Sequence, residues 1–333
     1  MAQQPVKNSA VASWLRSGLI GPLLLALIIG SCFLSLPWSM GNVKVQGGLR
    51  PRYEASNLQL ALLPPLWRGL SPEQSQRLEE QRAEGGYVPG LVFGTDRLGR
   101  DFFARCLMGG TISLAIGFAA AFLSVVIGTL YGAISGWNGG RIDAVLMRLV
   151  DILFGLPYIL LVVLLSVAVD GFMQREGAQP SGFMRQGINV LALLIAIGAV
   201  SWLAMARVIR GQVLSLRERP FIEAATAGGI PVHRQLSRHL LPNLMGPVIV
   251  YATLAVPAAI LSESFLSFLG IGVNEPLPSW GNLASSGLSE LNTVESRWWL
   301  LLWPCLLIGA TLLALNFLGD HLKDRFDPVR STP

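Results

Sequence analysis

Six long stretches of the chain contain no Asp, Glu, Lys or Arg, and charged segments separate them. The stretches cover residues 17–43, 106–140, 152–169, 186–206, 239–262 and 298–319. A helix needs about 20 mostly apolar residues to cross the hydrocarbon core of a bilayer. Backbone groups cannot stay unpaired in lipid, and the alternation typical of barrel strands is missing. The pattern therefore predicts an all-α integral membrane protein with six transmembrane helices.

The placement of Lys and Arg predicts the orientation of these helices. With both termini in the cytoplasm, 13 of the 25 Lys and Arg residues lie inside, and nine of the others lie in one long outer segment, where the rule has little force. We therefore predict cytoplasmic N and C termini. Trp298, Trp299 and Trp303 then begin the last span at the outer interface, where indole rings prefer to lie. A cleaved signal peptide is the alternative for the first stretch, but no A-x-A site follows it.

These assignments divide the chain into five segments. They are a cytoplasmic tail at 1–17, a first transmembrane helix at 18–38, an external segment at 39–106, a core with five further helices at 107–318, and a cytoplasmic tail at 319–333. In the external segment, Ser71, Pro72 and Glu73 have the N-cap, N1 and first-turn chemistry of a helix that runs to Glu84. We interpret this segment as a small subdomain or flap. A solvated helix without a function is the alternative.

Composition excludes several classes of function. Hydrophobic residues make up 52% of the chain and charged residues only 14%, which argues against a water-soluble globule. The three cysteines contain no C-x-x-C pair, and the three histidines have no acidic or cysteine partner at ligand spacing, so neither a disulfide framework nor a metal site is predicted. The basic residues follow the membrane topology and do not cluster, so no nucleic-acid partner is expected.

Motifs for catalysis are also missing from the sequence. None of the three lysines lies in a G-x-x-x-x-G-K-[ST] loop, and neither G-x-S-x-G nor H-E-x-x-H occurs. The chain is therefore predicted to be no enzyme and to bind no cofactor or ATP.

The largest inner connection, residues 207–243, is amphipathic. It contains FIEAATAGGIPVHRQLSRHLLPN, which predicts a helix at 221–227, a break at Gly228 and Gly229, and a second, basic helix that ends at Pro242. The small side chains of the first helix allow another surface to approach closely, and Gly229 permits a turn that a β-carbon would obstruct. The alternative is an interfacial helix with Arg234 and Arg238 facing anionic headgroups.

The residues of this loop resemble a known motif. Glu223-Ala224-Ala225, Gly229 and the later His239-Leu240-Leu241-Pro242 resemble the EAA motif in permease subunits of binding-protein-dependent ABC importers. Further segments resemble the second, C-type permease of the dipeptide/oligopeptide/nickel subfamily. They are GTDRLGRD at 94–101, GGTISLAIG at 109–117, RIDAVLMRLVD at 141–151, LSESFLSFLGIGV at 261–273, PSWGN at 278–282 and GDHLKDRFDP at 319–328. The external residues 41–92 resemble nothing known to us.

The resemblance implies a type I ABC importer permease fold in a bacterial inner membrane. It also implies a homologous permease as partner, two ATPase subunits or domains, an extracytoplasmic solute-binding protein, and peptides as substrate, with nickel or another small solute as the alternative. Coupling to the ATPase would rest on Glu223, Ala224, Ala225, Gly229, Leu241 and Pro242. Ion-gradient-driven secondary transport is an alternative from a different class.

Two acidic residues lie near or within the predicted spans, where charge is costly and often functional. Asp151 has Arg148 three residues earlier, so we favour a structural ion pair for it. Glu263 has no basic residue within a turn. The alternatives are that it lines the translocation path, as Ser262 would, or that it bonds to Ser262, Ser264 or a neighbouring helix. In the ion-gradient alternative, either acid would carry protons.

Overall fold

The computed structural model describes residues 20–45, 48–175, 182–292 and 295–326. Most of the described chain is helical, and the predicted tail at 1–17 and the end of the tail at 319–333 lie outside the described residues. The elements in chain order are α2 (Ile20–Leu34), α3 (Leu36–Ser39), β1 (Asn42–Val45), β2 (Gly48–Pro51), η1 (Leu58–Leu60), η2 (Leu66–Arg68), α4 (Pro72–Ala83), α5 (Phe102–Asn138), α6 (Gly140–Phe154), α7 (Tyr158–Arg175), α8 (Gly182–Arg217), α9 (Pro220–Ala227), α10 (Val232–Gln235), the π-helical segment η3 (Leu236–Leu240), α11 (Leu241–Phe268), α12 (Trp280–Leu288) and α13 (Trp299–Phe326).

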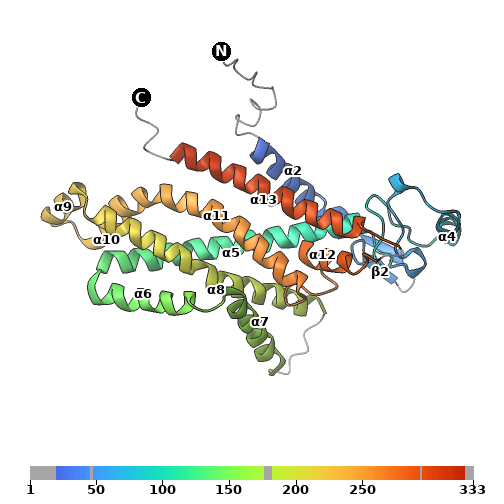
Figure 1. Cartoon of the computed structure of the whole chain (residues 1–333), viewed down its shortest axis with the longest axis horizontal. Coiled ribbons are helices and arrows are strands. Elements are labelled where there is room, and N and C mark those ends of the chain that lie inside the picture. The colour runs from blue at the N-terminus through green and yellow to red at the C-terminus, as the bar shows by residue number, and fades with distance from the viewer. Residues whose placement is uncertain (1–19, 46–47, 176–181, 293–294, 327–333) are drawn as a thin grey trace, which may run out of the picture.

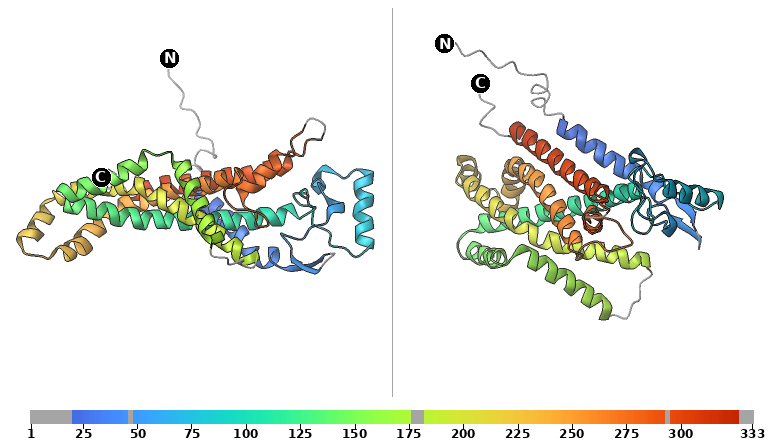
Figure 2. Two further views of the ribbon diagram at one scale, coloured as in Figure 1. Left: turned by 90° about the horizontal axis from the view of Figure 1, so that it is seen from below. Right: turned by 45° about the vertical axis from the view of Figure 1, so that its right-hand side comes forward.

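The long helices α5 and α8 form the centre of the bundle and lie side by side (Figures 1 and 2). Gly128, Gly132 and Gly136 lie one turn apart on the face of α5 that contacts α8. A β-carbon at Gly132 would overlap the carbonyl oxygen of Ala206, so only glycine permits this approach. Small residues at such a spacing are the usual means of close packing between membrane helices, because apolar side chains gain little over lipid.

Five helical segments of the described chain are long and apolar enough to cross a membrane. A sixth candidate span is a broken one, since α6 and α7 meet at 90°. The expected uninterrupted span at 152–169 is therefore wrong: it crosses the break at Gly155, Leu156 and Pro157. Proline disfavours helical geometry in the residue before it, which accounts for the end of α6 at this point.

The segment at 39–106, predicted to be external, is more structured than its sequence suggested. Residues of β1 and β2 pair antiparallel, with Asn42 opposite Pro51, and this hairpin was not predicted. The helix α4 begins as predicted, with Ser71 and Gln74 forming a capping box and Pro72 at the first position. A small core beneath it contains Leu60, Leu63, Leu78 and Leu91. The segment is thus a folded subdomain, in agreement with the first of the two interpretations.

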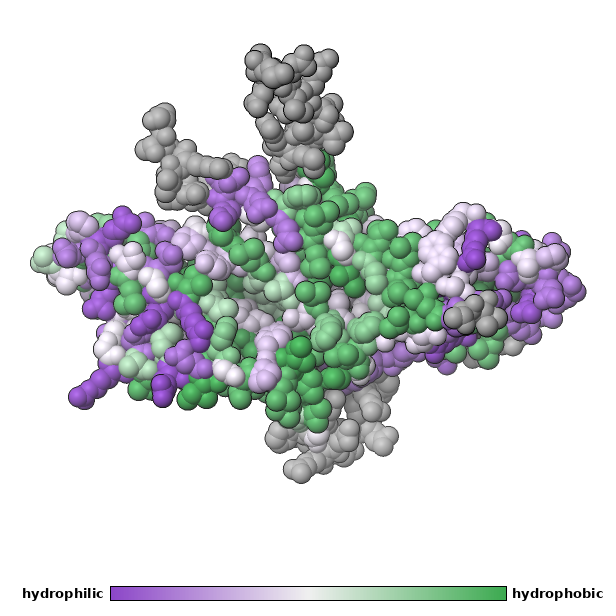
Figure 3. Space-filling model, in the orientation of Figure 1, coloured by the Kyte–Doolittle hydropathy of each residue, from purple (hydrophilic) through white to green (hydrophobic). Residues whose placement is uncertain are grey.

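Hydropathy divides the surface into three zones along the long axis. Figure 3 shows apolar residues over the middle of the molecule and hydrophilic residues at both ends. Figure 1 places α9 and α10 at one end, and α4 with the β1–β2 hairpin at the other. This distribution is what a bilayer requires of a bundle with two solvated ends.

Candidate functional site

The loop predicted to be cytoplasmic forms a helical hairpin of α9 and α10 at one end of the bundle. Helix α8 continues to Arg217, so the loop that leaves the bundle is shorter than the expected 207–243. Helix α9 follows, and the chain then turns back through α10. The first predicted helix, at 221–227, is therefore confirmed to within one residue.

A Schellman motif closes α9. The N–H of Ile230 donates to the carbonyl of Ala225 at 3.1 Å, and the N–H of Gly229 donates to that of Thr226 at 3.0 Å. Gly229 has φ +68°, a left-handed conformation that favours glycine. A β-carbon there would meet nothing within 4 Å, so backbone conformation alone, and not an obstructed turn, requires glycine.

The predicted coupling residues divide between two faces. Glu223 and Ala224 are exposed on α9, whereas Ala225 is buried together with Ile222. Leu241 and Pro242 are exposed at the start of α11. The hairpin thus presents a surface with small side chains and one carboxylate, and Ala225 holds that surface onto the rest of the loop.

Thr226 and Gln235, of which the sequence did not single out Gln235, fix the shape of the hairpin. Gln235 is buried and donates from Nε2 to the carbonyl of Ile230 at 2.7 Å. The hydroxyl of Thr226 lies 2.9 Å from the carbonyl of Ile222 and 3.3 Å from Gln235 Oε1. The turn is therefore cross-linked by side chains, and Thr226 contributes to that link.

The second helix of the hairpin does not end at Pro242. Helix α10 passes through the π-helical segment η3 directly into α11, where Pro242 lies in the first turn. The N–H of Leu241 donates to Leu236, five residues earlier. Proline has no N–H to donate, but it is tolerated in the first turn of a helix. The helical run therefore continues from η3 through Pro242 into α11. Here the sequence-based boundary was wrong.

A second cluster lies at the opposite end, in the GTDRLGRD segment. Asp96 accepts hydrogen bonds from the N–H groups of Leu98 and Arg100 at 2.9 Å and pairs with Arg100 Nε at 2.6 Å. Arg100 and the fully buried Arg105 also pair with Glu275, at 2.8 and 3.2 Å. The signature therefore joins the subdomain that contains α4 to α5 and to the loop before α12.

Two further residues of this segment stabilise the junction between the subdomain, α5 and the loop before α12. Asp101 caps α5 by accepting from Ala104 N–H and also accepts from Gly90 N–H. Gly99 has φ +67°, and a β-carbon there would overlap the carbonyl of Asn57.

The charges of the junction stabilise one another. Burial raises the pKa of Glu275, but the hydrogen bond from Arg100 and the positive charges of Arg105 and Arg100 outweigh it and hold that pKa below its usual value. Burial likewise lowers the pKa of Arg100, yet its bonds to Glu275 and Asp96 raise it overall. Both groups therefore remain charged at neutral pH.

The two acids expected near the spans have different environments. The partner of Asp151 is Arg207 of α8 at 2.8 Å, whose guanidinium also lies over the ring of Phe154, so the structural ion pair joins helices and does not involve Arg148. Glu263 is fully buried and accepts hydrogen bonds from Ser267 at 2.7 Å and Ser264 at 3.3 Å. The structure thus shows the expected bond to Ser264, together with one to Ser267 that was not expected.

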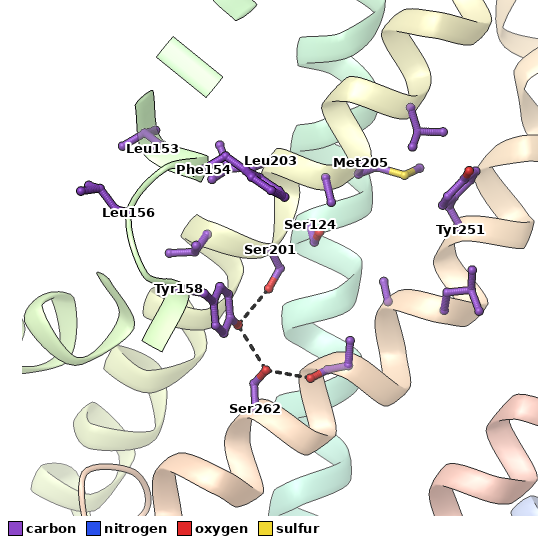
Figure 4. Close-up of a pocket in the computed structure, with 16 residues that line it drawn as sticks. Ser124, Leu153, Phe154, Leu156, Tyr158, Ser201, Leu203, Met205, Tyr251 and Ser262 are labelled. Carbon is purple, nitrogen blue, oxygen red and sulfur yellow. Dashed lines mark hydrogen bonds between the residues drawn. The ribbon is translucent and has the colours of Figure 1, made fainter. Parts of the chain in front are cut away.

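A cavity of about 490 Å³ opens beside the break between α6 and α7. Figure 4 shows Tyr158, the first residue of α7, pointing toward Ser201 of α8 and Ser262 of α11. Its hydroxyl donates to Ser262 Oγ at 3.3 Å and lies 3.4 Å from Ser201 Oγ. All other lining residues are apolar except Ser124 and Tyr251, and none carries a charge. Of the two predicted path residues, Ser262 lines this cavity and Glu263 does not.

A second cavity, of about 750 Å³, lies nearer the hairpin. It is lined by the ends of α8, α9, α11 and α13, including Arg219 and Lys323. Tyr251 and Leu254 line both cavities. The two spaces are therefore adjacent along α11, from the three hydroxyls to the hairpin end of the molecule.

Comparison with known proteins gives the family. Residues 128–331 match the model described as "Binding-protein-dependent transport system inner membrane component". The oligopeptide transport system permease protein OppC of Escherichia coli (strain K12) is 49% identical over 239 residues, which cover 72% of each chain. OppC of Haemophilus influenzae is 45% identical over 71% of this chain and 70% of its own length. The dipeptide transport system permease protein DppC of Lactococcus lactis is 32% identical over 98% of this chain and 88% of its own.

A solved structure agrees on the fold. The MetNI methionine ABC transporter, in inward facing conformations, superimposes with a TM-score of 0.50 at 17% identity, covering 66% of this chain and 94% of that one. Members of this family are non-catalytic membrane subunits of ABC importers. The alternative of an ion-gradient transporter is therefore wrong. The chain belongs to the binding-protein-dependent transport system inner membrane components and is a multi-pass permease of an ABC importer.

Proposed function

We propose that this permease passes oligopeptides or dipeptides across the inner membrane, as the C-type member of a pair of permeases. The relatives with 42–49% identity are oligopeptide and dipeptide permeases, which favours peptides over nickel or another solute. ATP hydrolysis belongs to two separate ATPase subunits, and a soluble binding protein delivers the peptide.

The observation that carries the coupling role is the exposed face of α9, with Glu223 and Ala224 on a hairpin at the end of the bundle. We propose that this face docks into the ATPase, that Leu241 and Pro242 border it, and that Gly229 shapes the turn. The hairpin and both termini then lie in the cytoplasm. Two observations support this: α2 begins against Phe317 of α13, and Lys323 near the end of α13 lines the same cavity as Arg219 and Phe221.

The coupling role is tested by Ala224→Trp in the assembled transporter. An indole on the docking face would keep the ATPase away, so peptide uptake and ATP hydrolysis stimulated by the loaded binding protein should both fall to background. Ala83→Trp, at an exposed alanine of α4 at the other end, is the matched control and should leave both activities unchanged. Normal activity of Ala224→Trp in an intact complex would refute the docking face.

We further propose that the two cavities form this chain's half of the translocation path, with Ser262 at its wall. Tyr158, Ser201 and Ser262 offer hydroxyls to a peptide main chain, and the uncharged lining of the cavity around them suits side chains of many kinds. Glu263 supports that wall from inside the protein.

Thiol labelling tests the path. In a Cys305→Ser background, where Cys32 and Cys106 are buried, Ser262→Cys should react with a small thiosulfonate and be protected during peptide transport. Ser264→Cys is the matched control and should not react, because Ser264 is buried. If the labelling rate of the Ser262→Cys variant is the same with and without peptide and nucleotide, this residue does not line the path.

A further inference from the structure

The external subdomain exposes two large apolar side chains on one short turn. Leu66 and Trp67 of η2 are each 57% exposed. Trp67 contacts the ring of Trp298, with ring centroids 5.9 Å apart, and Trp298 is itself exposed. Exposed apolar groups gathered at one place indicate an interaction surface.

The turn is held rigidly in place. Pro65 precedes it, and the N–H groups of Arg68 and Gly69 donate to Pro65 and Leu66 within the turn. The N–H of Leu66 donates to the carbonyl of Leu91, which belongs to the core of the subdomain. The exposure of Leu66 and Trp67 is therefore built into the subdomain and is not a feature of a loose loop.

The neighbour of this turn is the start of a membrane span. Trp298 immediately precedes α13, which is a candidate span from Trp299 to Asp324. Of the three tryptophans expected at the interface, Trp299 is buried and Trp303 stacks on Phe93, so only Trp298 is exposed. Further along α13, Leu302 and Leu306 are exposed, so the apolar surface of the span continues up to the turn.

A charged group completes the turn. The guanidinium of Arg68 lies 4.7 Å from the centre of the Trp299 ring, and the side chain is exposed. A cation–π contact holds the charge at the level where the span begins. Aromatic rings beside a basic side chain match the headgroup layer of a bilayer, where indole lies among the glycerol groups and Arg meets phosphate.

We propose that the turn Leu66–Arg68 is a membrane-surface anchor: Leu66 and Trp67 enter the interfacial layer of the bilayer beside Trp298, and Arg68 binds a lipid phosphate. The occupant is the phospholipid surface, because the patch continues the lipid-facing surface of α13. The anchor sets the height and tilt of the external subdomain over the membrane. It does not depend on which solute is transported.

The test uses the assembled transporter in nanodiscs without nucleotide or peptide. Leu66→Cys in the Cys305→Ser background is labelled with an environment-sensitive fluorophore. We expect emission at shorter wavelength than in water, and loss of emission when the lipids carry a nitroxide near the headgroup. Glu79→Cys on α4, exposed and far from the spans, is the matched control and should keep its emission.

Two other results would overturn the anchor. A label that is shielded yet unaffected by nitroxide lipids would place the partner permease on the patch. A label in water that becomes shielded only when the binding protein is added would make the patch a docking site for that protein. Neither result bears on peptide transport, so the anchor and the proposed function fail independently.

Discussion

The junction around GTDRLGRD and the hairpin around Gly229 lie at opposite ends of the molecule and use charged and glycine residues in opposite ways. At the junction, Arg105 is 1% exposed and the acidic partners enclose it. On the hairpin, Glu223 is exposed and Gly229 has open space around it. One motif therefore holds segments of the protein together, while the other leaves a surface exposed. Under the proposed coupling role, mutations should affect stability at one end and coupling at the other.

The largest loss of stability is expected for Arg105→Leu. It leaves the buried Asp96 and the carboxylate of Glu275 with fewer counter-charges, and breaking a buried pair costs about 3–5 kcal/mol. Thermal unfolding of the purified permease pair should show it. Arg97→Leu is the matched control: Arg97 is half exposed, and its partner Glu290 keeps a second ion pair with Arg297, so the loss should be about 0–1 kcal/mol. Equal losses for the two variants would show that the buried pairs of Arg105 contribute no more stability than the pair of Arg97.

Two glycine variants separate steric overlap from backbone strain. Gly99→Ala should destabilise by about 1–3 kcal/mol through overlap with Asn57, in addition to the cost of its positive φ. Gly229→Ala should carry only the conformational cost, about 1–2 kcal/mol, because its surroundings are open. Protease resistance of the folded complex measures both. A Gly229→Ala protein that fails to assemble would show that the hairpin has a structural role too.

Gln235→Leu should loosen the hairpin without unfolding the bundle. It leaves the carbonyl of Ile230 without its donor, at a cost of about 1–3 kcal/mol confined to the loop. Hydrogen exchange should rise in α9 and α10 only, and stimulated ATP hydrolysis should fall. Ser237→Ala, at an exposed residue of the same run, is the control. Unchanged exchange in α9 would mean that the Schellman turn suffices by itself.

The smallest effect concerns pH. Because the pKa of Glu275 is depressed in the folded protein, its stabilising contribution is complete above its unfolded value and is lost as pH falls through the folded value. The melting-temperature difference between wild type and Glu275→Gln should thus stay constant from about pH 7 to pH 5 and shrink below about pH 4. A difference that already shrinks near neutral pH would contradict the assigned charge state.

The sequence predicted the spans well where charge alone decides them. The runs without charge correspond to α5, α8, α11 and α13, since the cost of charge in lipid is a local property. The sequence also predicted α9 and the cap of α4, because caps and turn glycines likewise act over only a few residues.

What the sequence did not reveal depends on residues far apart in the chain. The pairing of Arg105 with Glu275 joins positions 170 residues apart, and the partner of Asp151 lies 56 residues away and not three. The break after α6 did have a local signal, Pro157 after Gly155, but the uncharged run concealed it. Gln235 had none, because its role follows from burial beneath the turn.

The glycine contact between α5 and α8 has a mechanical consequence. Helix α8 has 36 residues and is about 54 Å long, and only two residues separate it from α9. Fastened to α5 by backbone contact, it has little freedom to bend independently. We therefore expect a displacement of the hairpin to move α8 together with α5, with the cavity at Ser201 partway along their length.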